Sequence, residues 1–164
     1  MKMDSPDMAE IVQAVGRIQG GDPTGGRAAL LALWKRLGVG GTSMQRCVIA
    51  HFLADSEQDV AAALEWDLRA LQAATGSRDA VDADAIDPEL AGFLPSLHLN
   101  AGDAWRRMGD LDRARLHAAH GRSRSRALPV RGYGDMIRGG LARLADRVAS
   151  AASDPPDAKS SAAS

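Results

Sequence analysis

Residues 97–128 read LHLNAGDAWRRMGDLDRARLHAAHGRSRSRAL. Small and apolar residues recur at helical spacing on both sides of Gly109 and Asp110, which predicts two helices joined by a tight turn. Glycine accommodates the backbone of such a turn, and Asp110 is a favourable N-cap for the second helix. Gly102 lets the two helices approach closely, and Trp105 fills the space beyond. The stretch therefore predicts an antiparallel helical hairpin.

The rest of the chain has the same helical character. Apolar periodicity and capping residues predict helices over about 7–20, 23–37, 44–54, 57–73, 88–108, 111–127 and 134–150. We expect Ser56 and Asp59 to form a capping box that starts the fourth helix, and a break near Gly92 or Pro95 in the fifth. The helices form repeat-like hairpin units at 7–38, 44–74 and 95–128, followed by a last helix at 134–150.

Composition supports an all-α fold. The chain holds 31 Ala and 17 Leu, which favour helices, against 16 β-branched residues. Its 164 residues predict one domain, which we assign to 1–150. Residues 151–164 are mostly Ala, Ser, Asp and Pro and are expected to form a disordered tail. The richness in Ala, Gly and Arg fits a GC-rich, bacterial genome.

Composition also excludes several classes of protein. A single cysteine rules out a disulfide framework and a Cys-rich zinc site. No apolar run approaches the length of a membrane-spanning helix, and the first residues lack the apolar core of a signal peptide. We therefore expect a cytoplasmic protein without a membrane span.

The hairpin at 95–128 resembles the tetratricopeptide repeat (TPR). That family places a small residue and then an aromatic residue in the first helix, a Gly-Asp turn, and a small residue early in the second helix. The matching residues here are Gly102, Trp105, Gly109, Asp110, Ala114 and Pro129. A weaker copy at 44–74 has Ala50 and Ala63 in corresponding places. The resemblance implies a short right-handed superhelix of stacked hairpins, closed by a capping helix at 134–150.

The resemblance also implies a concave groove that binds a peptide. The groove positions of the 95–128 unit hold Asn100, Asp103, Arg106 and Arg107. Family members often place at the position of Asn100 an asparagine that binds the ligand backbone, and the two arginines suit a carboxylate. In the weaker copy the same positions include Gln45 and Phe52. The alternative is that the apolar residues there pack under the first hairpin.

Charge is strongly segregated along the chain. Residues 52–92 carry ten acids and two arginines, net −8, whereas residues 104–147 carry eleven arginines and four aspartates, net +7. Three interpretations follow. The two ends pair within one chain, they pair between copies in a homo-oligomer, or the Arg-rich segment 122–131 binds an acidic partner or nucleic acid as part of a regulatory module. Nucleic acid is the less expected partner because no aromatic residues are interleaved to stack on bases.

Catalytic and cofactor motifs are weak. His117 and His120 lie three residues apart on one helix face, but no third metal ligand accompanies them. Cys47 has no identifiable base beside it, and the glycines at 38–41 follow a helix, which does not fit a dinucleotide fingerprint. We therefore expect no metal, no cofactor and no catalytic residue. The sequence favours a non-catalytic scaffold or adaptor that binds a protein or peptide.

Overall fold

The computed structural model describes residues 5–79, 81 and 83–153, and in these residues the chain is helical and contains no strand. Their seven α-helices are α1 (Pro6–Gln19), α2 (Pro23–Leu37), α3 (Ser43–Asp55), α4 (Val60–Thr75), α5 (Leu94–Arg107), α6 (Leu111–Arg124) and α7 (Tyr133–Ser153). Short 3-10 helices cover Gly38–Gly40, Pro88–Leu90 and Ser125–Ala127. The all-α prediction is confirmed. Helix α7 continues to Ser153, and residues 154–164 of the predicted tail lie outside the described residues.

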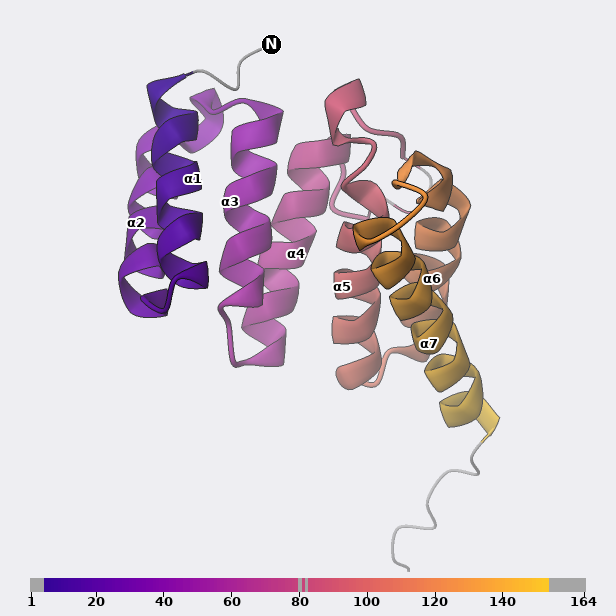
Figure 1. Ribbon diagram of the computed structural model, residues 1–164. Coiled ribbons are helices and arrows are strands. Elements are labelled where there is room, and N and C mark those ends of the chain that lie inside the picture. Colours follow the sequence, from indigo (N-terminus) through magenta and orange to yellow (C-terminus); the bar gives the residue numbers. More distant parts are fainter. Residues whose placement is uncertain (1–4, 80, 82, 154–164) are drawn as a thin grey trace, which may run out of the picture.

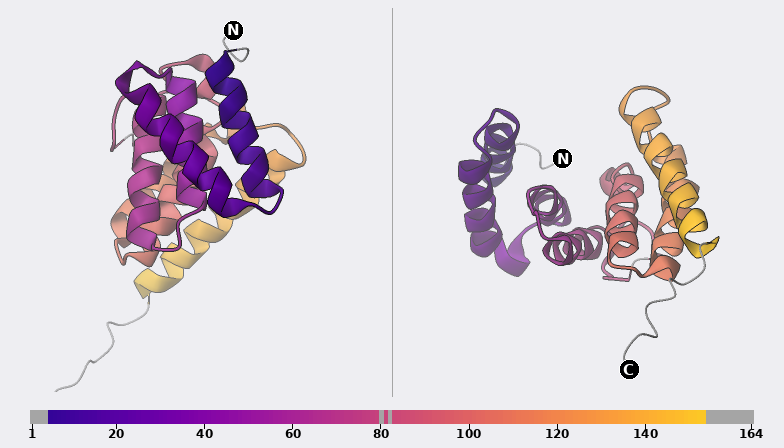
Figure 2. Two further views of the ribbon diagram at one scale, coloured as in Figure 1. Left: turned by 90° about the vertical axis from the view of Figure 1, so that its left-hand side faces the viewer. Right: turned by 90° about the horizontal axis from the view of Figure 1, so that it is seen from below.

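Consecutive helices pack as pairs. Helices α1 and α2, α3 and α4, and α5 and α6 form three hairpins, and α7 packs on both α5 and α6 (Figure 1). Helix α4 joins the second hairpin to α5. Seen from below, the helices follow a curved row with the first hairpin and α7 at its two ends (Figure 2). The predicted pairing of helices is therefore confirmed.

Three of the predicted helix starts are capped by their own side chains. The Asp22 carboxylate accepts a hydrogen bond from the Gly25 amide at 2.9 Å, and Asp110 accepts one from Arg113 at the same distance. Thr42 and Gln45 form a capping box in which each side chain accepts from the other's backbone amide. These caps satisfy amides that have no partner inside their helices.

The predicted start of the fourth helix is wrong. Helix α4 begins at Val60, and its N-cap is Asp59, whose carboxylate accepts from the Ala62 amide at 2.8 Å. Ser56 instead lies at the end of α3, where its hydroxyl donates to the Leu53 carbonyl at 2.8 Å and accepts from Arg27 at 2.7 Å. Ser56 and Asp59 are both favourable N-cap residues, but the Ser56 hydroxyl is bonded to Arg27 and Leu53, so Asp59 caps the helix.

Replacing Asp59 with alanine is expected to reduce the free energy of unfolding by about 1 kcal/mol, because α4 loses its N-cap. The neighbouring Gln58→Ala change is the control, since the Gln58 side chain is exposed and lies outside the helix. Urea unfolding followed by circular dichroism measures both. Equal effects of the two changes would contradict the role of Asp59.

The predicted break in the fifth helix is confirmed. The chain makes a 3-10 turn over Pro88–Leu90, and α5 begins only at Leu94. Pro95 lies in the first turn of α5, where a helix needs no amide hydrogen from it. Helix α6 ends at Arg124, earlier than predicted, and tightens into the 3-10 turn before Pro129.

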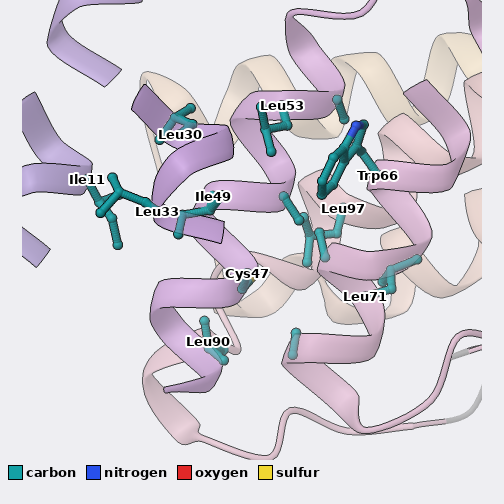
Figure 3. Close-up of a cluster of buried hydrophobic side chains, with 14 of the residues drawn as sticks. Ile11, Leu30, Leu33, Cys47, Ile49, Leu53, Trp66, Leu71, Leu90 and Leu97 are labelled. Carbon is teal, nitrogen blue, oxygen red and sulfur yellow. The ribbon is translucent and has the colours of Figure 1, made fainter. Parts of the chain in front are cut away.

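The largest core runs through the first five helices. Ile11, Leu30, Ile49, Leu71 and Leu97 come from α1 to α5 in turn, and each is fully buried (Figure 3). One smaller apolar cluster joins α6 to α7, a second joins Leu128 to α7, and Leu99 of α5 packs against both of them. The hairpins are therefore stacked through shared apolar surfaces, as expected when one hairpin cannot bury its apolar residues alone.

Candidate functional site

A cleft of about 500 Å³ opens beside α5. Its lining comes from the end of α3, the following turn, α4, α5 and α7. Three of the four residues predicted for the groove of the 95–128 unit, Asn100, Asp103 and Arg107, line this cleft. Figure 1 shows the start of α7 beside α5 and the rest of α7 in front of α6.

Helix α7 supplies one wall because it crosses α5 closely. A Cβ atom on Gly140 would lie 2.7 Å from the Leu99 side chain, so the helices meet at this glycine. Arg143 and Arg147 follow it at helical spacing and line the cleft. The start of α7 is anchored by Arg138, whose guanidinium donates to the carbonyls at 128 and 129 at 3.1 and 2.9 Å.

The opposite wall is acidic and contains a buried carboxyl. Asp67 of α4 is 3% exposed, and its Oδ1 has no hydrogen-bond partner within the described part of the chain. Burial raises the pKa of Asp67 to about 8, the charge of Asp55 adds to the rise, and the Asn100 amide opposes it. Asn100 also donates a hydrogen bond to Asp55 over 3.4 Å, and His51 lies 3.7 Å from the same carboxylate.

The arginines of the cleft are unpaired. Arg107, Arg143 and Arg147 are exposed, and none of them forms an ion pair with any residue that the structure describes. Arg106 behaves differently. It forms an ion pair with Asp103 one turn earlier at 2.9 Å, and it does not line the cleft. The cleft thus combines one buried carboxyl with three free guanidinium groups.

Gln45 and Phe52 lie outside the cleft. Gln45 is 6% exposed and serves as part of the capping box of α3, and its amide also donates to the Ser5 hydroxyl at 3.2 Å. Phe52 is half-buried and packs against the main core. Both side chains contribute to packing and capping in the N-terminal half of the molecule.

The residues quoted for the repeat-like packing lie between helices. A Cβ atom on Gly102 would approach Leu144 to 2.8 Å and the Cβ atom of His117 to 3.1 Å, so α5 needs a glycine there. Ala114 and Ala50 are fully buried, whereas Ala63 lines the cleft. Gly109 has a φ of 87° in the turn before Asp110. Trp105 is half-buried beneath the guanidinium of Arg113, 4.5 Å from its ring centre.

A buried histidine pair lies between α5 and α6. The Nδ1 atoms of His98 and His117 are 3.0 Å apart, so one ring donates and the other accepts. Burial lowers the pKa of His98 to about 3 and that of His117 to about 4, and both rings are neutral at physiological pH. No three His, Cys, Asp or Glu side chains in the described residues are grouped to hold a metal ion.

The charged halves of the chain are joined at Arg124. Its guanidinium donates to the Ala83 carbonyl at 2.7 Å and lies 3.7 Å from Asp84, which belongs to the acidic stretch 52–92. Other arginines of the basic half pair with aspartates on their own helices, in the pairs Arg113–Asp110, Arg115–Asp112 and Arg138–Asp135. Arg122 is exposed on α6 and has no ion pair in the described part of the chain.

Sequence reasoning missed five charged residues of the cleft, Asp55, Glu57, Asp67, Arg143 and Arg147. A signal for Asp67 was present. It lies three residues after Leu64 and four after Ala63, on the apolar face of its helix, where a charged residue is rarely placed without a partner. The two arginines carry no such signal, because exposed arginines on a surface helix are ordinary.

No helix in the described residues is both long and apolar enough to cross a bilayer. Comparison with protein-family models, with curated proteins and with solved structures gives no match for this chain. The cleft must therefore be interpreted from its own residues.

Proposed function

We propose that this chain is a non-catalytic binding module that holds a segment of a protein or peptide partner in the cleft between α4, α5 and α7. The observation that carries the proposal is a set of ionisable groups in the cleft that lack partners among the described residues: Oδ1 of the buried Asp67 carboxyl, and the guanidinium groups of Arg107, Arg143 and Arg147. Unpaired charged groups at one concave surface are poised to bind a ligand of complementary charge.

An extended peptide suits the cleft better than a small substrate. The cleft is open to solvent and is formed by three different parts of the chain, so a ligand can lie along it. Asn100 offers an amide donor and acceptor for a peptide backbone. Cys47 and the His98–His117 pair are buried and do not line the cleft.

We also propose that the stacked hairpins form a TPR-like array. The support is local. Gly102 allows close packing of α5, a glycine with positive φ precedes the Asp110 cap, and α7 covers the last hairpin as a terminal helix. In such arrays the first helices of successive hairpins line the inner surface, and α3, α5 and α7 contribute to the cleft together with α4.

Peptides selected on the immobilised wild-type chain from a random display library test the function. We expect Asn100→Ala and Arg107→Glu each to weaken the selected peptides by at least about tenfold in fluorescence polarisation. Arg122→Glu is the matched control, because it makes the same charge change at an exposed, unpaired arginine outside the cleft. Helical circular dichroism verifies that each variant is folded.

The same variants test the alternative that segment 122–131 binds nucleic acid. That alternative predicts oligonucleotide binding that falls steeply with salt and is lost in Arg122→Glu. Failure to enrich any peptide, or enriched peptides that bind all variants equally, would contradict the proposed use of the cleft.

A further inference from the structure

From the environment of Asp67 we infer that the acidic wall of the cleft is a receptor for one cationic side chain, an arginine or a lysine, of the bound partner. The inference rests on the proposed function and adds the chemistry of the partner's anchoring residue. It concerns the wall formed by Asp67 and Asp55, and it makes no use of the arginines opposite.

The first argument is that one oxygen of the Asp67 carboxyl lacks a partner, although the Asn100 amide donates a hydrogen bond to this side chain. Asp67 is 3% exposed, its Oδ1 accepts no hydrogen bond in the described residues, and it lines the cleft. Burying a carboxyl without a partner is costly, so this position is unfavourable for the empty chain. A hydrogen-bond donor brought to this oxygen would satisfy it.

The second argument concerns the sign of the ligand's charge. Asp55 lies near enough to Asp67 to raise the pKa of that carboxyl, so the two acids repel one another when both are ionised. A cation between them relieves both the repulsion and the burial of charge. Arg107, Arg143 and Arg147 line the same cleft yet form no ion pair with Asp67, so within residues 5–79, 81 and 83–153 no cation is supplied to this carboxyl.

The third argument favours an organic cation over a metal ion. No cluster of three potential metal ligands exists among the described residues. Two carboxyl groups and the Asn100 side chain are too few oxygen ligands for calcium, which takes six to eight. A guanidinium or ammonium group needs fewer acceptors and brings its own hydrogen-bond donors.

Binding of the cation is coupled to loss of a proton. At pH 7 the Asp67 carboxyl holds its proton, because burial raises its pKa to about 8, and an incoming cation displaces that proton to solvent. The other titratable groups that line the cleft are Asp55, Glu57, Asp103, Arg107, Arg143 and Arg147, and His51 lies beside Asp55. Affinity is therefore expected to rise about tenfold per pH unit between pH 6 and pH 8 and to level off above.

Two small probes of equal shape test the inference directly. Nα-acetyl-arginine methylamide carries a guanidinium, and Nα-acetyl-citrulline methylamide replaces it with a neutral urea. In NMR titrations of the full chain we expect the arginine probe to shift the amides of Asp55, Asp67 and Asn100, and the citrulline probe to bind at least about tenfold more weakly. Affinity of the arginine probe should increase with pH as stated.

Asp67→Asn is expected to lower the affinity of the arginine probe about tenfold and to remove its rise with pH. Asp55→Asn, at an exposed position that leaves the core intact, should weaken binding and provides a second reading if Asp67→Asn fails to fold. Asp146→Asn makes the same chemical change on α7 outside the cleft and should have no effect.

Equal affinity for the two probes, no binding of the arginine probe, or an unchanged pH profile in Asp67→Asn would overturn the inference. The proposed function fails separately. Selected peptides could bind the Arg107→Glu chain more weakly and yet keep their affinity when each of their arginines is replaced by citrulline and each lysine by norleucine. Such a result would support the cleft as the binding site and contradict only the cationic anchor.

Discussion

Replacing Gly26 with alanine is expected to lower the free energy of unfolding by about 2–3 kcal/mol. Gly26 is buried at the crossing of α1 and α2, where a Cβ atom would lie 2.6 Å from the Ala14 carbonyl oxygen and 2.9 Å from the Ile18 amide nitrogen. Both are backbone atoms of α1. A side chain could rotate away, but a helix backbone must move as a unit, so the first hairpin has to open.

Gly16→Ala is the matched control in the same hairpin. Gly16 is exposed in the interior of α1, and a Cβ atom there meets nothing within 4 Å. Alanine is the better helix former, so this change is expected to raise the free energy of unfolding by about 0.5–1 kcal/mol. Urea denaturation measures both variants. If both substitutions change the free energy of unfolding in the same direction, the close crossing of α1 and α2 is not the reason for a glycine at position 26.

In an Asp67→Asn background, lowering the pH from 7 to 5 is expected to reduce the free energy of unfolding by about 3 kcal/mol. The cause is the buried pair of histidines, His98 and His117. Folding lowers the pKa of His98 to about 3 and of His117 to about 4, so protons bind first to the unfolded chain. The stability contributed by the two neutral histidines is fully present above the pKa of about 6.5 that they have in the unfolded chain. It declines as the pH falls, until the pH lies below their pKa values in the folded chain.

The wild-type chain should lose less over the same interval. Folding raises the pKa of Asp67 to about 8, so its contribution to stability is complete below the unfolded pKa of about 3.9 and is lost as the pH rises towards 8. Acidification from pH 7 to pH 5 therefore stabilises the fold through Asp67 by about 2 kcal/mol and offsets most of the loss from the histidines.

Urea unfolding at pH 5, 6 and 7 separates the two contributions. Adding His98→Gln and His117→Gln to the Asp67→Asn chain should flatten its pH dependence, even though the core becomes less stable at every pH. A pH slope that is the same with and without the histidines would assign the acid sensitivity to other groups.

Much of the fold was predictable because its determinants are local. Asp22, Thr42 and Asp110 each cap a helix through an amide three residues further on, and such interactions are visible as short sequence patterns. The error at Ser56 shows where this fails. Both Ser56 and Asp59 fit the pattern, and the choice between them involves Arg27, which is 29 residues from Ser56 in the sequence.

The cleft was predictable only on the side formed by α5. Asn100, Asp103 and Arg107 follow from the periodicity of one helix. The other wall depends on where α7 crosses α5, which is determined by the contact of Gly140 with Leu99 across 41 residues of sequence. Arg106 and Arg107 are neighbours in the sequence, yet Arg106 forms an ion pair with Asp103 and only Arg107 lines the cleft.

The position of the cleft has a consequence for how the molecule unfolds. Its walls belong to different hairpins and to α7, and stacked helical hairpins can melt one unit at a time from the ends. A ligand that touches both walls links the second hairpin to the last helix, so that neither can melt without releasing the ligand. An occupied cleft would therefore convert gradual melting into a single cooperative transition, with the C-terminal helix gaining the most protection from hydrogen exchange.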